Sequence, residues 1–128
     1  MRVKTFRDLL VWQKAMSLAR GVYAATGTFP KEEMFGLSSQ MRRAAVSIPS
    51  NIAEGQGQLT DKAFVLYLSR ARGSLCELQT QAELAKSLGF VCGPEIAHLL
   101  EDCDEIGRMI HGLIKSMAVS RDSSTQQK

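Results

Sequence analysis

The two histidines and their acidic neighbours are the residues of this chain whose types and spacing come nearest to metal chemistry. Glu95 and His98 have the Glu-x-x-His spacing that di-iron helical bundles use to place both ligands on one helical face. Such a site needs a second copy of the motif and two further inward glutamates, and no glutamate lies three residues before His111, the other histidine. Glu95 is also typical of a first helical turn, where a carboxylate complements the helix dipole. We therefore expect no metal site.

The cysteines and glycines offer no catalytic set. Cys76, Cys92 and Cys103 form no Cys-x-x-Cys pair, and their spacing with the histidines fits none of the usual zinc patterns. An odd number of cysteines without such a pair is typical of a reducing compartment. The segment 55–57 follows a predicted helix rather than a strand and lacks the Gly-Lys-Ser/Thr of a phosphate loop. We expect a protein that is not an enzyme, uses no cofactor and has no small-molecule substrate.

Four arginines are the best candidates for contact with the phosphates of a nucleic acid: Arg42, Arg43, Arg70 and Arg72. The planar guanidinium group suits phosphate because it can donate two hydrogen bonds at once. The alternative is that these side chains are solvated or form structural ion pairs, as surface charges commonly do. The aromatic content of 6% leaves little for a surface that stacks bases.

A polar stripe on the second predicted helix recurs at steps of three and four residues and comprises Gln40, Arg43, Ser47, Asn51 and Glu54. An ordinary solvated face would explain it. Serine, asparagine and proline are poor helix formers, however, so a structural polar network or a contact between subunits explains the choice of residues better. Arg43 and Glu54 lie about three turns apart, so their partners should come from another helix or another chain.

Four helices are predicted to position these residues, at about 8–25, 31–54, 61–88 and 94–119. In the third and fourth, apolar residues alternate steps of four and three, which indicates near-parallel left-handed packing. The third helix carries Phe64, Leu68, Ala71, Leu75, Leu78, Ala82 and Ala85, and the fourth carries Ile96, Leu99, Cys103, Ile106, Ile110, Leu113 and Met117. With short connections, the sequence predicts an all-α, antiparallel up-and-down four-helix bundle over residues 1–119 and a disordered polar tail over residues 120–128.

Pro49 lies inside the second predicted helix. Proline removes a backbone donor and crowds the preceding turn, yet the apolar spacing continues across it from Ala45 to Ile52. We therefore expect one helix that bends at Pro49 and ends at Gly55. The bend is expected to direct Asn51, Glu54 and Gly55 toward a neighbouring helix or subunit, as a structural site.

The apolar surface exceeds what a lone bundle buries. The first helix has two adjacent apolar stripes, one of them containing Trp12, and the third has apolar residues outside its main seam. Uncovered, this surplus would be an exposed apolar patch, so self-association is expected. The length of 128 residues indicates one domain, and a formal charge of +3 permits nucleic-acid contact without requiring it. With no signal-peptide core and no membrane-length apolar run, a cytoplasmic location is expected.

The chain resembles a known family over about residues 6–118. The most specific segment runs from Gln40 to Gly55, and support comes from Val11-Trp12-Gln13-Lys14-Ala15, Phe35-Gly36-Leu37-Ser38-Ser39-Gln40 and Gly73-Ser74-Leu75-Cys76-Glu77-Leu78. These segments resemble bacterial four-helix-bundle proteins that are also called 23S rRNA intervening-sequence proteins. The chain is also similar to the accessory proteins of diversity-generating retroelements, which form barrel-like pentamers and bind nucleic acid.

The resemblance implies a small up-and-down bundle and a homo-oligomer, as a pentamer, that contacts nucleic acid. Together with the basic residues it favours a non-enzymatic scaffold that contacts structured RNA or a nucleoprotein. The alternative is a protein–protein interaction module without nucleic-acid contact, which would use the acidic segment 95–105.

Overall fold

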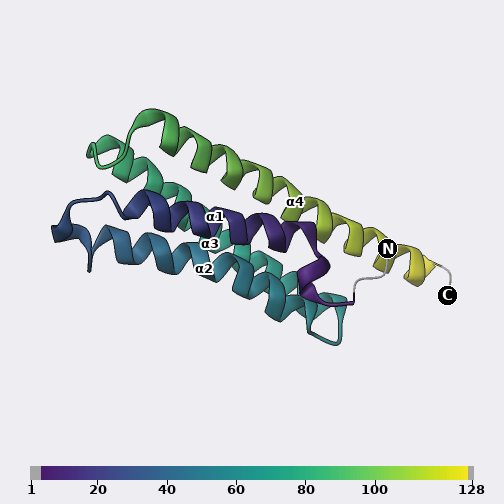
Figure 1. Ribbon diagram of the computed structural model, residues 1–128. Helices are drawn as coiled ribbons and strands as arrows, with labels where there is room; N and C mark the ends of the chain where they lie inside the picture. Colours follow the sequence, from purple (N-terminus) through teal and green to yellow (C-terminus); the bar gives the residue numbers. More distant parts are fainter. Residues whose placement is uncertain (1–3, 127–128) are drawn as a thin grey trace.

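The structure, a computed structural model, describes the backbone of residues 4–126 and the side chains of residues 4–118. Four long helices account for most of it (Figure 1): α1 (Leu10–Thr26), α2 (Leu37–Gln56), α3 (Asp61–Ser87) and α4 (Gly93–Gln126). Two short 3-10 helices, η1 (Phe6–Asp8) and η2 (Lys31–Glu33), precede α1 and α2. No strand occurs in this described part, which confirms the predicted all-α class.

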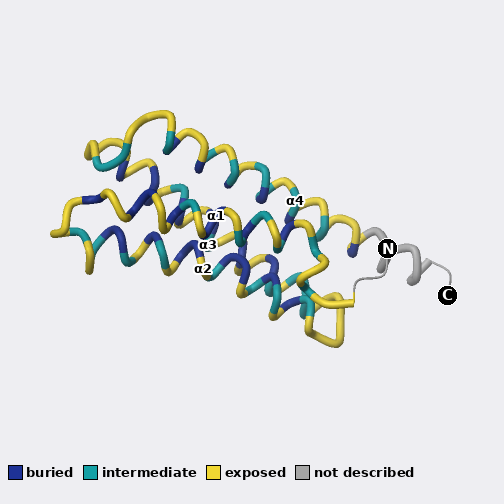
Figure 2. Tube along the Cα trace, viewed as in Figure 1, coloured by how far each residue is buried: buried dark blue, intermediate teal, exposed yellow. Residues whose placement is uncertain are grey.

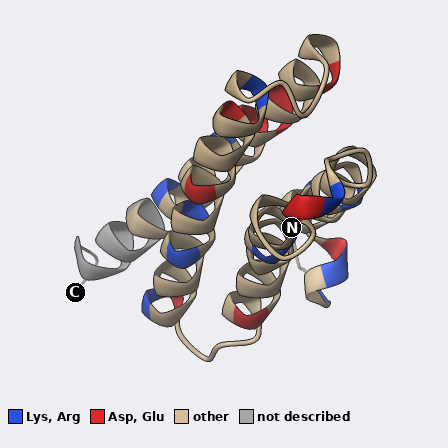
Figure 3. Cartoon of the chain, turned by 90° about the vertical axis from the view of Figure 1, so that its left-hand side faces the viewer, with Lys and Arg blue, Asp and Glu red and all other residues tan. Residues whose placement is uncertain are grey.

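The helices form a four-membered ring in cross-section. Each helix contacts the next one along the chain, and α1 also contacts α4, whereas the diagonal pairs make no contact among the described residues. This pattern, with short connections, confirms the antiparallel up-and-down bundle. It also places the α1–α2 pair and the α3–α4 pair on opposite sides of the molecule, as the turned view in Figure 3 shows. None of the helices searched, within the described residues, has the length and apolar character needed to cross a membrane.

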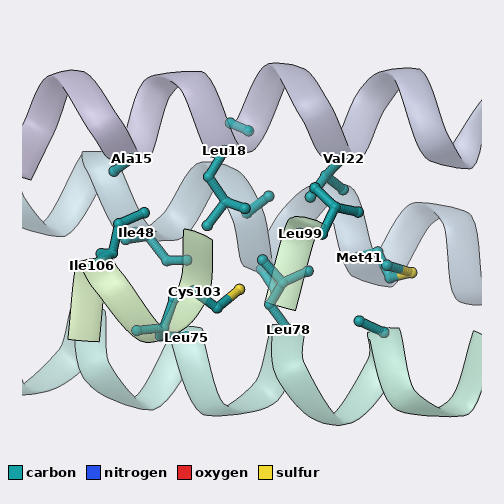
Figure 4. Packing of buried hydrophobic residues seen from close by; sticks show 14 of the residues in the cluster. Ala15, Leu18, Val22, Met41, Ile48, Leu75, Leu78, Leu99, Cys103 and Ile106 are labelled. Atoms are coloured by element: carbon teal, nitrogen blue, oxygen red, sulfur yellow. The ribbon is translucent and has the colours of Figure 1, made fainter. Parts of the chain in front are cut away.

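The core fills the space that the four helices enclose. Buried positions follow the inner face of every helix (Figure 2), and side chains such as Leu18, Met41, Leu78 and Ile106 point into the same central volume (Figure 4). All seven predicted seam positions of α3 and of α4 are buried or pack against this cluster. The alternation of three and four residues therefore identified the inner face of both helices correctly.

Several helix ends carry residues that commonly cap or end a helix. Thr60 caps α3, because its hydroxyl oxygen accepts a hydrogen bond of 3.1 Å from the backbone N–H of Ala63. Gly27 follows the last residue of α1. α3 ends at Ser87. Gly89, two residues later, has a φ of +75°, the left-handed backbone conformation that commonly follows the end of a helix.

Two predicted boundaries of the second helix were wrong. α2 begins at Leu37 rather than near residue 31, because η2 and a turn occupy the intervening residues. The Glu33 carboxylate accepts a hydrogen bond of 3.1 Å from the N–H of Leu37 and so caps the later start. Gly55 does not end the helix, which continues to Gln56 with Gly57 as its C-cap. Gly55 is instead buried against α3.

α2 passes through Pro49 as one helix, as the apolar spacing predicted. The bend itself stays a prediction. At the other end of the chain, α4 extends to Gln126, further than the expected end near residue 119. The division into a bundle domain and a disordered tail also stays a prediction, since the side chains of residues 119–128 lie outside the described part.

Candidate functional site

An apolar groove runs between α1 and α2 on the outside of the bundle. Its volume is about 540 Å³, and its lining comprises Phe6, Trp12, Met16, Ala19, Arg20, Tyr23, Val46, Pro49, Ser50 and Ala53. Apart from Arg20, the α1 residues in this set form the apolar stripe containing Trp12 that was identified from the sequence. The partly buried Trp12 meets the ring of Phe6 edge-on, with ring centroids 5.2 Å apart. The packed rings of Phe6 and Trp12 therefore form one end of the groove.

A second hollow of about 550 Å³ continues the groove toward the start of α2. Tyr23, Val46 and Ser50 line both, so the two form one surface along the α1–α2 pair. Phe35, in the turn before α2, lines the second hollow and is 92% exposed. We call this combined area the α1–α2 surface. A free monomer would leave it in water, which is unusual for a contiguous apolar area of this kind.

Arg42 has a structural role at the end of α1. Its Nε donates a hydrogen bond of 2.8 Å to Thr26 Oγ1, and its Nη2 lies 3.4 Å from the carbonyl oxygen of Tyr23. Its guanidinium carbon also lies 4.7 Å from the centroid of the Tyr23 ring. A cation is favourable here because the last carbonyls of a helix lack partners within it and carry partial negative charge. These contacts leave Arg42 less free for phosphate than the sequence suggested.

The polar stripe of α2 forms a hydrogen-bond network with α3. Ser47 and Ser74 share a hydrogen bond of 2.7 Å between their hydroxyl oxygens. Asn51 Nδ2 donates to the carbonyl oxygen of Ser47 at 2.8 Å and to its hydroxyl at 3.0 Å. The expected structural network therefore exists for these residues. Glu54, in contrast, is exposed, and its backbone oxygen accepts from Gln58 Nε2.

The structure does not gather the four candidate arginines into one site. Arg43 is exposed between two hollows: it lines a polar one with Ser74 and Glu77 of α3, and it also lines the second hollow of the α1–α2 surface, together with Arg42. The exposed Arg70 stacks on Tyr67, with its guanidinium carbon 4.9 Å from the ring centroid. Arg72 lines a groove between α3 and α4.

This α3–α4 groove is a feature that sequence reasoning missed. It has a volume of about 400 Å³ and is lined by Arg72, Leu75, Cys76, Gln79, Cys103, Asp104, Gly107, Arg108 and His111. Arg108 and His111 are one turn apart on α4 and meet Arg72 of α3 across the groove. Their spacing of three residues was the available signal. Only the register of α3 and α4 shows that these two residues line a groove together with Arg72.

The candidate metal and cysteine chemistry finds no shared site. Across the described residues, no three His, Cys, Asp or Glu side chains lie together as a metal site would require. His98 Nε2 lies 3.6 Å from Asp102 rather than joining Glu95. Cys103 is buried in the core, and this burial raises the pKa of its thiol to about 12, with smaller contributions from Asp102 and Asp104. A thiol with so high a pKa is a poor nucleophile at neutral pH.

Comparison with known proteins agrees with the resemblance seen in the sequence. The family profile described as 23S rRNA-intervening sequence protein matches residues 7–112, which confirms that prediction. Among solved structures, a protein with unknown function from the S23 ribosomal protein family of Bacteroides thetaiotaomicron is 22% identical, with a TM-score of 0.75. The match covers 83% of this chain and 99% of that one, and at this identity it shows a shared fold alone. No curated protein matches the sequence.

Proposed function

This chain belongs to the family of 23S rRNA-intervening sequence proteins, and we propose that it is a non-enzymatic homo-oligomeric scaffold that contacts structured RNA or a nucleoprotein. The observation that carries the proposal is the α1–α2 surface, an apolar groove that the fold of one chain leaves uncovered. A second copy of the chain is the partner we assign to it. The resemblance to ring-forming accessory proteins favours a pentamer, and the arginines support contact with phosphates.

Self-association can be tested with one substitution and a matched control. Val46 lines both hollows of the α1–α2 surface and is 43% exposed, so Val46→Arg places a charge at its centre without disturbing the core. Leu84 of α3 is 49% exposed and lies outside this surface, so Leu84→Arg makes a comparable change elsewhere. In sedimentation equilibrium at micromolar concentration, the wild type and Leu84→Arg should be oligomeric, and Val46→Arg should be largely monomeric. A wild-type monomer would refute self-association, and an oligomer sensitive only to Leu84→Arg would refute the choice of surface.

Contact with RNA predicts a specific dependence on salt. Binding through phosphates releases counterions, so affinity for a structured RNA should fall steeply between about 50 and about 200 mM salt. An oligomer strengthens such binding because each subunit repeats the same weak contacts. Absence of RNA binding at the low end of this range would refute the RNA part of the proposal.

The second candidate function is a protein–protein interaction module. The segment 95–105 of α4 favours it, since it contains Glu95, Glu101, Asp102, Asp104 and Glu105 and no Arg or Lys. An acidic helical face suits a basic protein partner through complementary charge. Protein capture that survives nuclease treatment, without measurable RNA affinity, would favour this candidate.

A further inference from the structure

Charge is strongly segregated along the α3–α4 pair. Residues 62–76 of α3 and 106–118 of α4 contain Lys62, Arg70, Arg72, Arg108 and Lys115 and no Asp or Glu. The other halves of the two helices carry seven carboxylates: Glu77, Glu83, Glu95, Glu101, Asp102, Asp104 and Glu105. In Figure 3, most of the red on this helix pair lies toward the α3–α4 connection, and most of the blue lies toward the opposite end. Asp61, the first residue of α3, is the one carboxylate beside these five cations among the described side chains, and Lys86 lies in the acidic half. One half of the pair is therefore predominantly basic.

The α3–α4 groove lies at the boundary of these two halves and opens into the basic one. Arg72, Arg108 and His111 line it, and Asp104 at its acidic side accepts a hydrogen bond of 3.0 Å from Gln79. Neither arginine forms an ion pair with any described side chain. Both are exposed on helices fixed by the core beneath them, so their guanidinium groups are anchored by rigid elements rather than by a loop.

We infer that this α3–α4 groove binds the phosphate groups of an RNA backbone, with Arg72 and Arg108 as the principal contacts and His111 as a further donor. The inference rests on the proposed function and identifies the surface responsible for it. Two guanidinium groups on facing helices can each donate two hydrogen bonds to phosphate oxygens. An open groove of about 400 Å³ accommodates a backbone phosphate and its neighbours. Backbone phosphates position a protein on RNA without reading its sequence.

The position of the groove fits an oligomer that uses the α1–α2 surface. The α3–α4 pair lies on the opposite side of the bundle, so a second copy on the α1–α2 surface leaves the groove accessible. Each subunit of the assembly would then present one phosphate-binding groove. The Asp104 carboxylate borders the groove on one side and repels phosphate. Removing its charge should therefore strengthen RNA binding, whereas removing an arginine should weaken it.

The experiment measures the affinity of the full chain for a fluorescent RNA hairpin with a stem of about 20 base pairs, which spans the two successive minor grooves that double-stranded RNA presents to a protein. Arg72→Gln and Arg108→Gln should each weaken binding by roughly 5- to 10-fold near 0.1 M salt. The double variant should lower the magnitude of the salt slope by about 1.5 to 2, and Arg72→Lys should retain most of the slope because the charge remains. Asp104→Asn should tighten binding about 2- to 5-fold.

Lys86→Gln is the control, since Lys86 is an exposed cation near the end of α3 that lines neither the α3–α4 groove nor the α1–α2 surface. It should leave the affinity within about 2-fold of wild type. Sedimentation and circular dichroism should show that every variant keeps its oligomeric mass and helical content.

The outcomes separate the two proposals. If the wild type fails to bind the hairpin at about 50 mM salt, the RNA part of the proposed function is wrong and the inference falls with it. If the wild type binds and the double variant keeps the same affinity and salt slope, the groove is wrong while RNA contact stands. An effect of Lys86→Gln equal to that of Arg72→Gln would likewise overturn the groove, because it would show phosphate contacts spread over the whole surface.

Discussion

Gly55 offers the sharpest test of how α2 and α3 pack. A Cβ atom added at this position would lie 2.7 Å from Cβ of Tyr67 and 2.8 Å from Cδ1 of Phe64. Ordinary contacts between such atoms are about 3.5–4.0 Å, so Gly55→Ala creates an overlap that one flexible side chain cannot relieve. Cβ of Tyr67 is attached directly to the α3 backbone, so the helices themselves must move apart.

The expected free energy follows from two opposing effects. Overpacking of this kind costs about 2–3 kcal/mol, toward the upper end of the usual range, because backbone is involved. Replacing glycine by alanine inside a helix returns about 1 kcal/mol through helix propensity. Gly55→Ala should therefore lower the free energy of unfolding by about 1–2 kcal/mol.

Gly73 provides a matched control within α3. It lies in a helix interior, and a Cβ added there would meet nothing within 4 Å. Gly73→Ala should therefore raise the free energy of unfolding by about 1 kcal/mol. Urea denaturation followed by circular dichroism, at one fixed protomer concentration, measures both changes. If Gly55→Ala stabilised the protein as Gly73→Ala does, the close approach of α2 and α3 at Gly55 would be refuted.

Three further perturbations test other parts of the molecule. Pro49→Ala should raise the stability of the isolated subunit, because proline is unfavourable in a helix interior. It should also weaken self-association measured by sedimentation, because Pro49 lines the α1–α2 groove. Unchanged oligomer mass and RNA affinity would show that Pro49 has no role in assembly. Thr60→Ala should cost about 1 kcal/mol in urea denaturation through loss of the α3 cap, and no loss would contradict the capping bond. In the folded protein, a thiol reagent should label Cys76 and Cys92 quickly and Cys103 only after unfolding. Because the pKa of Cys103 is raised, the contribution of the neutral thiol to stability is complete below about pH 9 and is lost toward about pH 12. Over that window the free energy of unfolding of the wild type should fall by about 1.4 kcal/mol per pH unit more than that of Cys103→Ala. Parallel pH profiles would contradict the burial of the thiol.

The helices and their inner faces were predictable because the signals are local. In α3 and α4, each step of three or four residues returns the chain to the same face of the same helix, so the seam needs no knowledge of the neighbours. Caps are equally local, since Thr60 contacts a residue three positions away. The expected start of the second helix near residue 31 was wrong, because a turn before Leu37 interrupts the helix and leaves Met34 exposed. Spacing alone cannot detect such an interruption.

The helix contact at Gly55 and the surroundings of Arg42 could not be predicted for a different reason. A glycine at the end of an apolar run is compatible with a helix stop or with a close helix contact, and only the position of α3 distinguishes the two. Arg42 and Arg43 are adjacent in sequence but about 100° apart around the helix. One therefore meets the end of α1, while the other lies exposed on the α2–α3 side. Both border the second hollow of the α1–α2 surface, but the hydrogen bonds that Arg42 makes to α1 give the two neighbours different surroundings.

The α3–α4 groove was beyond sequence reasoning for a similar reason. Arg72 and Arg108 come from different helices, and their meeting depends on the antiparallel register of α3 and α4. The hydrogen bond between Gln79 and Asp104 helps to define that register. Neither arginine belongs to a motif that indicates a partner on the other helix.

Self-association and RNA binding are coupled if both proposals hold. The direction in which one variant changes the RNA affinity tests this coupling. Val46→Arg adds a positive charge, so a purely electrostatic view of a monomer predicts tighter RNA binding. If the α1–α2 surface holds the oligomer together, the same substitution removes the repeated α3–α4 grooves from one assembly, and avidity falls by 10-fold or more, roughly. We expect weaker RNA binding by Val46→Arg and no weakening by Leu84→Arg, which adds the same charge but leaves the oligomer intact. Tighter binding by a monomeric Val46→Arg would show that a single groove acts alone, and the oligomer would then serve another purpose.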